Sequence, residues 1–208
     1  MMYDAGIAEV FKWSVDDEGR YGANSIGRSL ITARNAVKAN NGCSFVNVNY
    51  GGWDMHQSMF DRSYEPNIYT LAGNLDRAVG ALVQDLKAAG QFDKTLIVIM
   101  GEFGRTPGAL NSRGGRDHHK DAMSAVLLGG GVKGGQAIGE TDGNGARVIT
   151  PGWKADRAVY MEDRACTIYS ALGIDYTRAV TDTPSGRKFE YVQYATTGQY
   201  VPVEEVFG

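Results

Sequence analysis

The chain has 208 residues, enough for one domain of ordinary size, and its formal net charge is -3. This charge provides no basic surface that could neutralise phosphates along a duplex, so a nucleic-acid partner is not expected. A membrane is not expected either, because no apolar run approaches the roughly 20 residues that cross a bilayer and residues 1–20 carry too many charges for a signal peptide.

Apolar residues at spacings of three and four predict three helices, over residues 24–39, 66–89 and 161–172. Asn24 is a candidate N-cap for the first helix. Gly90 and Gly173 stand where the second and third helices are expected to end.

Short runs rich in aliphatic and β-branched side chains predict three buried strands, over residues 43–48, 95–100 and 123–128. The first two strands and the helix between them form a strand–helix–strand unit, which implies parallel pairing with a right-handed crossover. We therefore expect an α/β fold with a largely parallel sheet flanked by helices. A single domain over residues 1–208 is expected to contain it.

The two cysteines, Cys43 and Cys166, lie far apart in the sequence. Free cysteine packs as a small hydrophobic residue, so we predict two buried free thiols. A disulfide-stabilised scaffold is not indicated.

All three histidines lie in two short segments rich in metal-ligand residue types, residues 51–56 and 115–119. Imidazole nitrogen and carboxylate oxygen are ligands that zinc and other divalent first-row ions accept. A third segment, residues 101–107, directly follows a predicted strand. Because ligands of open α/β sheets bind at the carboxyl ends of strands, we interpret the three segments as one site.

Asp54 and His56 are two residues apart, so both side chains can reach one ion. The alternative is that Asp54 caps a turn and His56 makes an ordinary hydrogen bond.

Adjacent side chains usually point apart, so we expect His118 to bind the same ion as Asp117. His119 is then expected to donate to a carboxylate or to bound substrate. The alternative is a polar loop with an Arg116–Asp117 ion pair.

Glu102 can be a buried carboxylate that binds the metal, or the partner of Arg105 in a surface ion pair. Its position at the end of a predicted strand, between Gly101 and Gly104, favours the first interpretation, because glycine permits the backbone angles that turn a carboxylate inward. Arg105 has a rigid donor fork that matches phosphate or sulfate oxygens.

The order of these motifs resembles the bacterial family catalogued as domain of unknown function 1501, from about residue 21 to the end. The resemblance is carried by Gly-Gly-Trp-Asp-Met-His, Gly-Glu-Phe-Gly-Arg-Thr-Pro, Gly-Arg-Asp-His and Gly-Gly-Gly-Val-Lys-Gly-Gly. That family is similar to the alkaline phosphatase and sulfatase superfamily, whose members hydrolyse phosphate or sulfate esters at one or two divalent metals. This resemblance implies that Asp54 and His56 match the superfamily's aspartate and histidine ligand pair, and that His118 matches its late histidine ligand.

The chain departs from the superfamily pattern at two positions and resembles only its C-terminal half. Glu102 stands where an aspartate is usual, and Phe103 stands where a histidine ligand is usual. The superfamily's nucleophile lies in the N-terminal half, so we assign none and expect a fragment or a truncated product. A periplasmic or secreted location is implied if the family's export signal precedes the chain.

The residues and the resemblance together predict a metal-dependent hydrolase of phosphate or sulfate esters, or the metal-binding C-terminal part of one. The predicted ligands of one divalent ion are Asp54, His56, Glu102, Asp117 and His118. Zinc is expected, with calcium or manganese as alternatives, and the expected substrate is a small anionic ester or a sulfated or phosphorylated glycan. Arg105 and His119 are the predicted catalytic residues. Two other hypotheses are a noncatalytic module that binds metal or glycan on the same fold, and a hydrogen-bonded loop network without metal.

Overall fold

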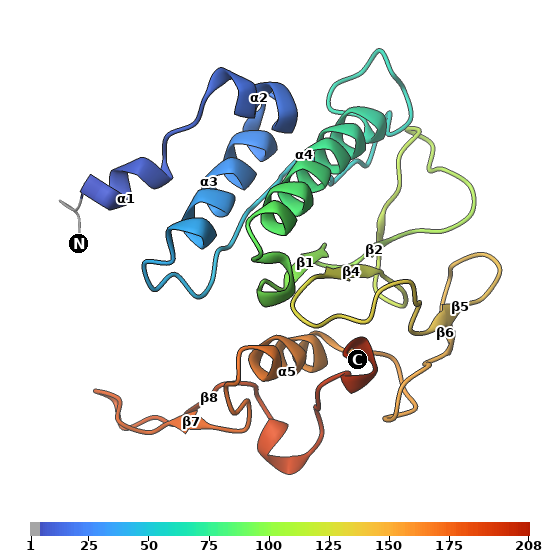
Figure 1. The fold of residues 1–208 in the computed structure, drawn as a ribbon. Coiled ribbons are helices and arrows are strands. Elements are labelled where there is room, and N and C mark those ends of the chain that lie inside the picture. The colour runs from blue at the N-terminus through green and yellow to red at the C-terminus, as the bar shows by residue number, and fades with distance from the viewer. Residues whose placement is uncertain (1–4) are drawn as a thin grey trace. The chain divides into compact units, whose positions relative to one another are not determined.

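The computed structural model describes residues 5–208, which form two compact units (Figure 1). The first unit contains the described residues up to Thr95 together with Gly108–His118, and the second contains Leu96–Pro107 and His119–Gly208. One domain over residues 1–208 stays a prediction. Among the described helices, none is both long and apolar enough to cross a bilayer.

The first unit is helical, and its elements are α1 (Ala5–Val10), α2 (Val15–Tyr21), α3 (Ser25–Ala39), α4 (Ile68–Ala88) and the short 3-10 helix η1 (Phe92–Lys94). The helices predicted over residues 24–39 and 66–89 are confirmed as α3 and α4. Each begins at an asparagine whose side-chain oxygen accepts backbone N–H groups, Asn24 for α3 and Asn67 for α4. The two helices lie side by side, and α2 packs against both (Figure 1).

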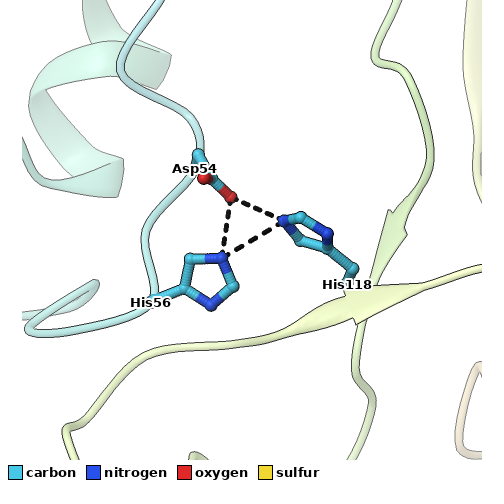
Figure 2. Close-up of side chains that lie close together, drawn as sticks. All are labelled: Asp54, His56 and His118. Atoms are coloured by element: carbon cyan, nitrogen blue, oxygen red, sulfur yellow. Dashed lines mark hydrogen bonds and ion pairs between the residues drawn. The ribbon is translucent and has the colours of Figure 1, made fainter.

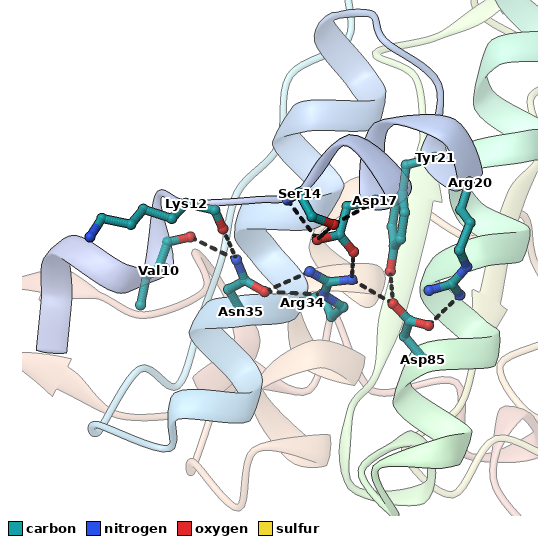
Figure 3. Close-up of polar contacts among 9 residues, drawn as sticks. All are labelled: Val10, Lys12, Ser14, Asp17, Arg20, Tyr21, Arg34, Asn35 and Asp85. Carbon is teal, nitrogen blue, oxygen red and sulfur yellow. Dashed lines mark hydrogen bonds and ion pairs between the residues drawn. The ribbon is translucent and has the colours of Figure 1, made fainter.

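A buried charge network joins α2, α3 and α4 (Figure 3). Nη1 of Arg34 donates to Oδ1 of Asp17 at 2.5 Å and to Oδ2 of Asp85 at 2.7 Å. Asp85 also accepts hydrogen bonds from the Tyr21 hydroxyl and the Arg20 guanidinium. The side chain of Arg34 is only 9% exposed, so these carboxylates must offset the cost of burying its positive charge. Because the partners lie on different helices, the network fixes how the three helices pack.

The second unit contains one α-helix, short strands and two 3-10 helices. The strands are β1 (Ile97–Met100), β2 (Gly104–Arg105), β4 (Ala125–Leu128), β5 (Glu140–Thr141), β6 (Val148–Thr150), β7 (Ala179–Val180) and β8 (Phe189–Glu190), and β3 (His118–His119) begins at the last residue of the first unit. The helices are α5 (Met161–Ala171), η2 (Ala195–Thr197) and η3 (Glu204–Val206). The helix predicted over residues 161–172 is confirmed as α5.

The predicted α/β fold with a largely parallel sheet is wrong. Most of the regular secondary structure of the described residues is helical, and their strands form only two-stranded antiparallel sheets. Strands do form within the predicted ranges 95–100 and 123–128, as β1 and β4, but they pair directly with each other, Ile97 opposite Leu128 and Met100 opposite Ala125. Residues 43–48 form no strand, and residues 43–47 are exposed, so no crossover joins parallel strands. A parallel sheet requires cover on both faces, whereas Val126 in β4 is 49% exposed.

The core of the second unit consists of two small clusters of buried side chains. One contains Trp153, Val203 and Val206, and the other contains Cys166, Val192 and Ala195. Cys43 and Cys166 are both free thiols, as predicted, but only Cys166 is buried. The predicted burial of Cys43 is wrong, because the buried strand over residues 43–48 that Cys43 was expected to open does not form.

Candidate metal site

Two segments of the first unit that lie about sixty residues apart in the sequence are held together by their backbones. One segment contains Asp54 and His56, and the other is the loop Gly108–His118. Three backbone hydrogen bonds of 3.0 to 3.1 Å join them, from Ser58 N to Arg113 O, from Met59 N to Gly114 O and from Arg116 N to Met55 O. The positions of both histidine-bearing segments are therefore set by main-chain contacts.

Gly115 allows this close approach. A Cβ atom on Gly115 would lie 2.1 Å from the carbonyl carbon of His56 and 2.3 Å from the nitrogen of Gln57. Real Cβ contacts essentially never fall below 3.0 Å, so no other residue fits here without separating the segments.

Apolar packing fixes the residues on either side of His56. Met55 and Met59 are buried in a cluster with Leu71 at the start of α4, and Trp53 packs against this cluster. Burial of Met55 and Met59 anchors the chain, while Asp54 and His56 remain accessible, with side chains 60% and 31% exposed.

Asp54, His56 and His118 bring three ligand atoms close together (Figure 2). Oδ1 of Asp54 lies 3.0 Å from Nε2 of His56 and 3.0 Å from Nε2 of His118. The two Nε2 atoms are 3.2 Å apart. Ligands at 2.0 to 2.1 Å from a tetrahedral zinc ion stand about 3.3 Å from one another, so the three atoms fit one ion with little movement.

The electrostatics of the group also fit a cation. A carboxylate oxygen and two imidazole nitrogens at these separations repel one another through their lone pairs, unless a proton or a metal ion lies among them. The side chain of His118 is 51% exposed and that of Asp54 is 60% exposed, so a bound ion would have room for water or substrate. Such an open position is typical of catalytic sites, whereas structural zinc sites are closed by four protein ligands.

An open cavity of about 310 Å³ adjoins the group, and its lining includes Asp54, His56, Gln57 and Tyr64. Its volume lies at the lower end of the range for small-molecule sites, roughly 300 to 1,000 Å³.

Asp117 contacts the opposite side of the His56 ring. Its Oδ1 accepts a hydrogen bond of 2.7 Å from Nδ1 of His56 and one of 3.2 Å from Nδ2 of Asn111. The hydrogen bond from His56 is the main reason why the pKa of Asp117 lies below its ordinary value.

The remaining predicted site residues, Glu102, Arg105 and His119, belong to the second unit. Nη2 of Arg105 lies 3.6 Å from Oε1 of Glu102, and the Glu102 side chain is 65% exposed. This contact is the ion pair considered as the alternative for Glu102. Nε2 of His119 donates to the carbonyl oxygen of Ala146 at 2.7 Å. Metal binding by Glu102 and the catalytic roles of Arg105 and His119 stay predictions.

The sequence interpretation missed Asn111 and Gly115 as determinants of the site. Gly115 is the first residue of the Gly-Arg-Asp-His motif, and a glycine next to candidate ligands indicates a place where two backbone segments can approach closely. Asn111 lies in a stretch with the composition of an ordinary turn, and no local pattern distinguishes it.

Comparison with known proteins identifies a family. The family model described as "Protein of unknown function (DUF1501)" matches residues 10–202. Neither the curated proteins nor the solved structures contain a significant match.

Proposed function

The chain belongs to the DUF1501 family of proteins of unknown function, and we propose that it is a metal-dependent hydrolase of phosphate or sulfate esters, or the metal-binding part of one. The observation that carries the proposal is the group formed by Asp54, His56 and His118. Its nitrogen and oxygen atoms have the chemistry and the spacing that zinc accepts, and manganese and calcium are the alternatives.

A divalent ion bound there would supply Lewis-acid chemistry, by polarising an ester oxygen and lowering the pKa of a bound water. The exposure of Asp54 and His118 supports a catalytic rather than a purely structural ion, because substrate needs an open coordination position. The rigid donor fork of Arg105 matches the oxygens of a phosphate or sulfate ester, and this chemistry supports its proposed role in stabilising charge on them. His119 stays proposed as a donor to a carboxylate or to substrate, because imidazole can supply such a hydrogen bond.

The adjoining cavity supports a small anionic ester as the substrate. Its volume of about 310 Å³ suits a single small molecule, so a sulfated or phosphorylated glycan would be bound through one sugar unit. Gln57 and Tyr64 line this cavity, and Nε2 of Gln57 donates to the hydroxyl of Tyr64. That hydroxyl can in turn donate to a polar leaving group.

Metal analysis of the purified protein tests the proposal. Mass spectrometry of the protein prepared without chelators is expected to find about one zinc, manganese or calcium ion per chain. His56→Ala and His118→Ala are expected to lose this ion. His119→Ala, the matched control that removes the histidine outside the group, is expected to keep it.

Hydrolysis of p-nitrophenyl phosphate and p-nitrophenyl sulfate by the metal-loaded protein tests the catalytic part. Stoichiometric metal without hydrolysis of either ester would favour a noncatalytic metal-binding module. Absence of metal from the wild-type protein, with ordinary stability in both histidine variants, would refute the proposal and leave a hydrogen-bonded loop network.

A further inference from the structure

The two ring nitrogens of His56 have different surroundings. Nδ1 lies 2.7 Å from Oδ1 of Asp117, whereas Nε2 faces Asp54 and His118. An ionised carboxylate can only accept hydrogen bonds, so Nδ1 must carry the proton in this contact. Neutral His56 then presents a lone pair from Nε2 toward Asp54 and His118.

Asp117 is in turn held by Asn111, whose side chain is bonded at both ends. Oδ1 of Asn111 accepts hydrogen bonds from the backbone nitrogens of Arg113 and Gly115, both at 3.0 Å. These bonds fix which way the amide points. Nδ2 therefore faces the other way, and it donates to Asp117 at 3.2 Å and to the backbone oxygen of His56 at 3.1 Å.

We propose that Asp117 and Asn111 are positioning residues, which hold His56 in its Nδ1–H tautomer so that Nε2 is available to bind a metal ion. The inference rests on the proposed metal site. It gives Asp117 a role different from the ligand role predicted from the sequence, because its carboxylate binds Nδ1 of His56 and so orients a ligand without contacting the ion. Asn111 acts one contact further away and keeps the carboxylate aligned with the ring.

The tautomer can be measured without any metal. In the metal-free protein labelled with ¹⁵N-histidine, long-range ¹H–¹⁵N NMR at alkaline pH distinguishes the two ring nitrogens. Resonances of His56 are assigned by their loss in His56→Ala. We expect a protonated Nδ1 in the wild type, and a shift toward the Nε2–H form, which neutral histidine prefers in water, in Asp117→Ala.

Zinc titrations against a competing chromophoric chelator measure the consequence. Asp117→Ala is expected to weaken zinc binding about 10- to 100-fold, the usual effect of losing a carboxylate behind a metal-binding histidine. Asp117→Asn keeps an acceptor oxygen without the charge and should fall between this variant and the wild type. Asn111→Ala is expected to weaken binding less than Asp117→Ala, because the carboxylate itself remains.

Asp61→Ala is the matched control. Asp61 is an exposed aspartate of the same unit, and its carboxylate bonds only locally, to the backbone and hydroxyl of Ser63. Circular dichroism establishes that each variant is folded. Asp61→Ala is expected to bind zinc as the wild type does.

The cobalt(II) absorption spectrum separates a positioning role from a ligand role. Loss of a positioning residue leaves the ligand set, and hence the visible bands, essentially unchanged at saturating cobalt. A changed band pattern in Asp117→Ala would instead make Asp117 a ligand and overturn the inference.

The remaining outcomes distinguish this inference from the proposed function. An Nε2–H tautomer of His56 in the wild type, or zinc affinity unaffected by Asp117→Ala, would overturn the positioning role alone. A wild-type protein that shows the Nδ1–H tautomer but binds no divalent metal would refute the metal site, and with it the purpose assigned to Asp117.

Discussion

Replacing Gly115 by alanine tests whether close backbone contact builds the candidate metal site. The added Cβ would stand 2.1 Å from the His56 carbonyl carbon, so the two segments must separate by about 1 Å to reach the shortest tolerated contact of 3.0 Å. Because the atoms that Cβ would meet belong to the backbone, no side-chain rotation can relieve the clash.

The magnitude follows from the hydrogen bonds that this separation breaks. Three backbone bonds of 3.0 to 3.1 Å would lengthen beyond hydrogen-bonding distance, at a cost of about 1 kcal/mol each. Alanine recovers roughly 0.4 to 1 kcal/mol by restricting the unfolded chain, which leaves a net loss of about 2 to 2.6 kcal/mol. If bringing His118 back to His56 requires this free energy, zinc affinity falls roughly 30- to 70-fold, at about 1.4 kcal/mol per factor of ten.

Urea unfolding and zinc titration measure the two effects, and Gly51→Ala is the control. Gly51 lies three residues before Asp54, and a Cβ atom there would meet nothing within 4 Å. We expect Gly51→Ala to match the wild type in both assays. Equal stability and equal zinc affinity in Gly115→Ala and Gly51→Ala would refute the argument that this contact organises the site.

Two further predictions concern the helical network and the thiols. The hydrogen bond from Arg34 lowers the pKa of Asp17, and hydrogen bonds from Arg20, Arg34 and Tyr21 outweigh burial to lower that of Asp85. The stabilisation by these two carboxylates is therefore complete above about pH 4 and is lost as the pH falls below it. We expect Asp85→Asn to lower the free energy of unfolding, measured with urea, by about 2 kcal/mol at pH 7. In this variant the free energy of unfolding should also depend less on pH below about 4. Burial raises the pKa of Cys166 to about 11, whereas Cys43 is exposed, so a thiol reagent at pH 8 should label Cys43 rapidly and Cys166 only on unfolding. Rapid labelling that persists in Cys43→Ser would contradict the second expectation.

The helices could be predicted because their signals are local. Residues 24–39 carry both the apolar spacing and the asparagine cap of α3, and the observed helix, Ser25–Ala39, begins directly after that cap. The same holds for α5, where the prediction of residues 161–172 differs from the observed Met161–Ala171 by one residue. Short-range periodicity and capping are sufficient for such elements.

The sheet could not be predicted because strand pairing is not a local property. Residues 43–48 have the aliphatic composition of a buried strand, yet no partner strand covers them, and Phe45 is 68% exposed. β1 and β4 have a similar composition and do pair, but antiparallel to each other. Composition indicates that a segment can be a strand, and only tertiary contacts decide whether it pairs and in which direction.

Within the candidate site, residue type was sufficient for Asp54, His56 and His118 but not for Asp117. All four have metal-binding side chains, so the sequence groups them. Whether a carboxylate faces Nε2 of His56, as Asp54 does, or Nδ1, as Asp117 does, depends on the path of the loop. Asn111 and Gly115 determine this path through contacts with residues more than fifty positions away.

The error in the fold has unequal consequences for the predicted site residues. Glu102 was favoured as a metal ligand because ligands gather at the carboxyl ends of parallel strands, and without a parallel sheet that reason no longer applies. Asp54, His56 and His118 do not depend on it, since their approach is fixed inside the first unit by three backbone hydrogen bonds and one glycine. The metal-site proposal therefore rests on local geometry that the correction of the fold leaves intact, and the variants of Gly115 and Asp117 test that geometry directly.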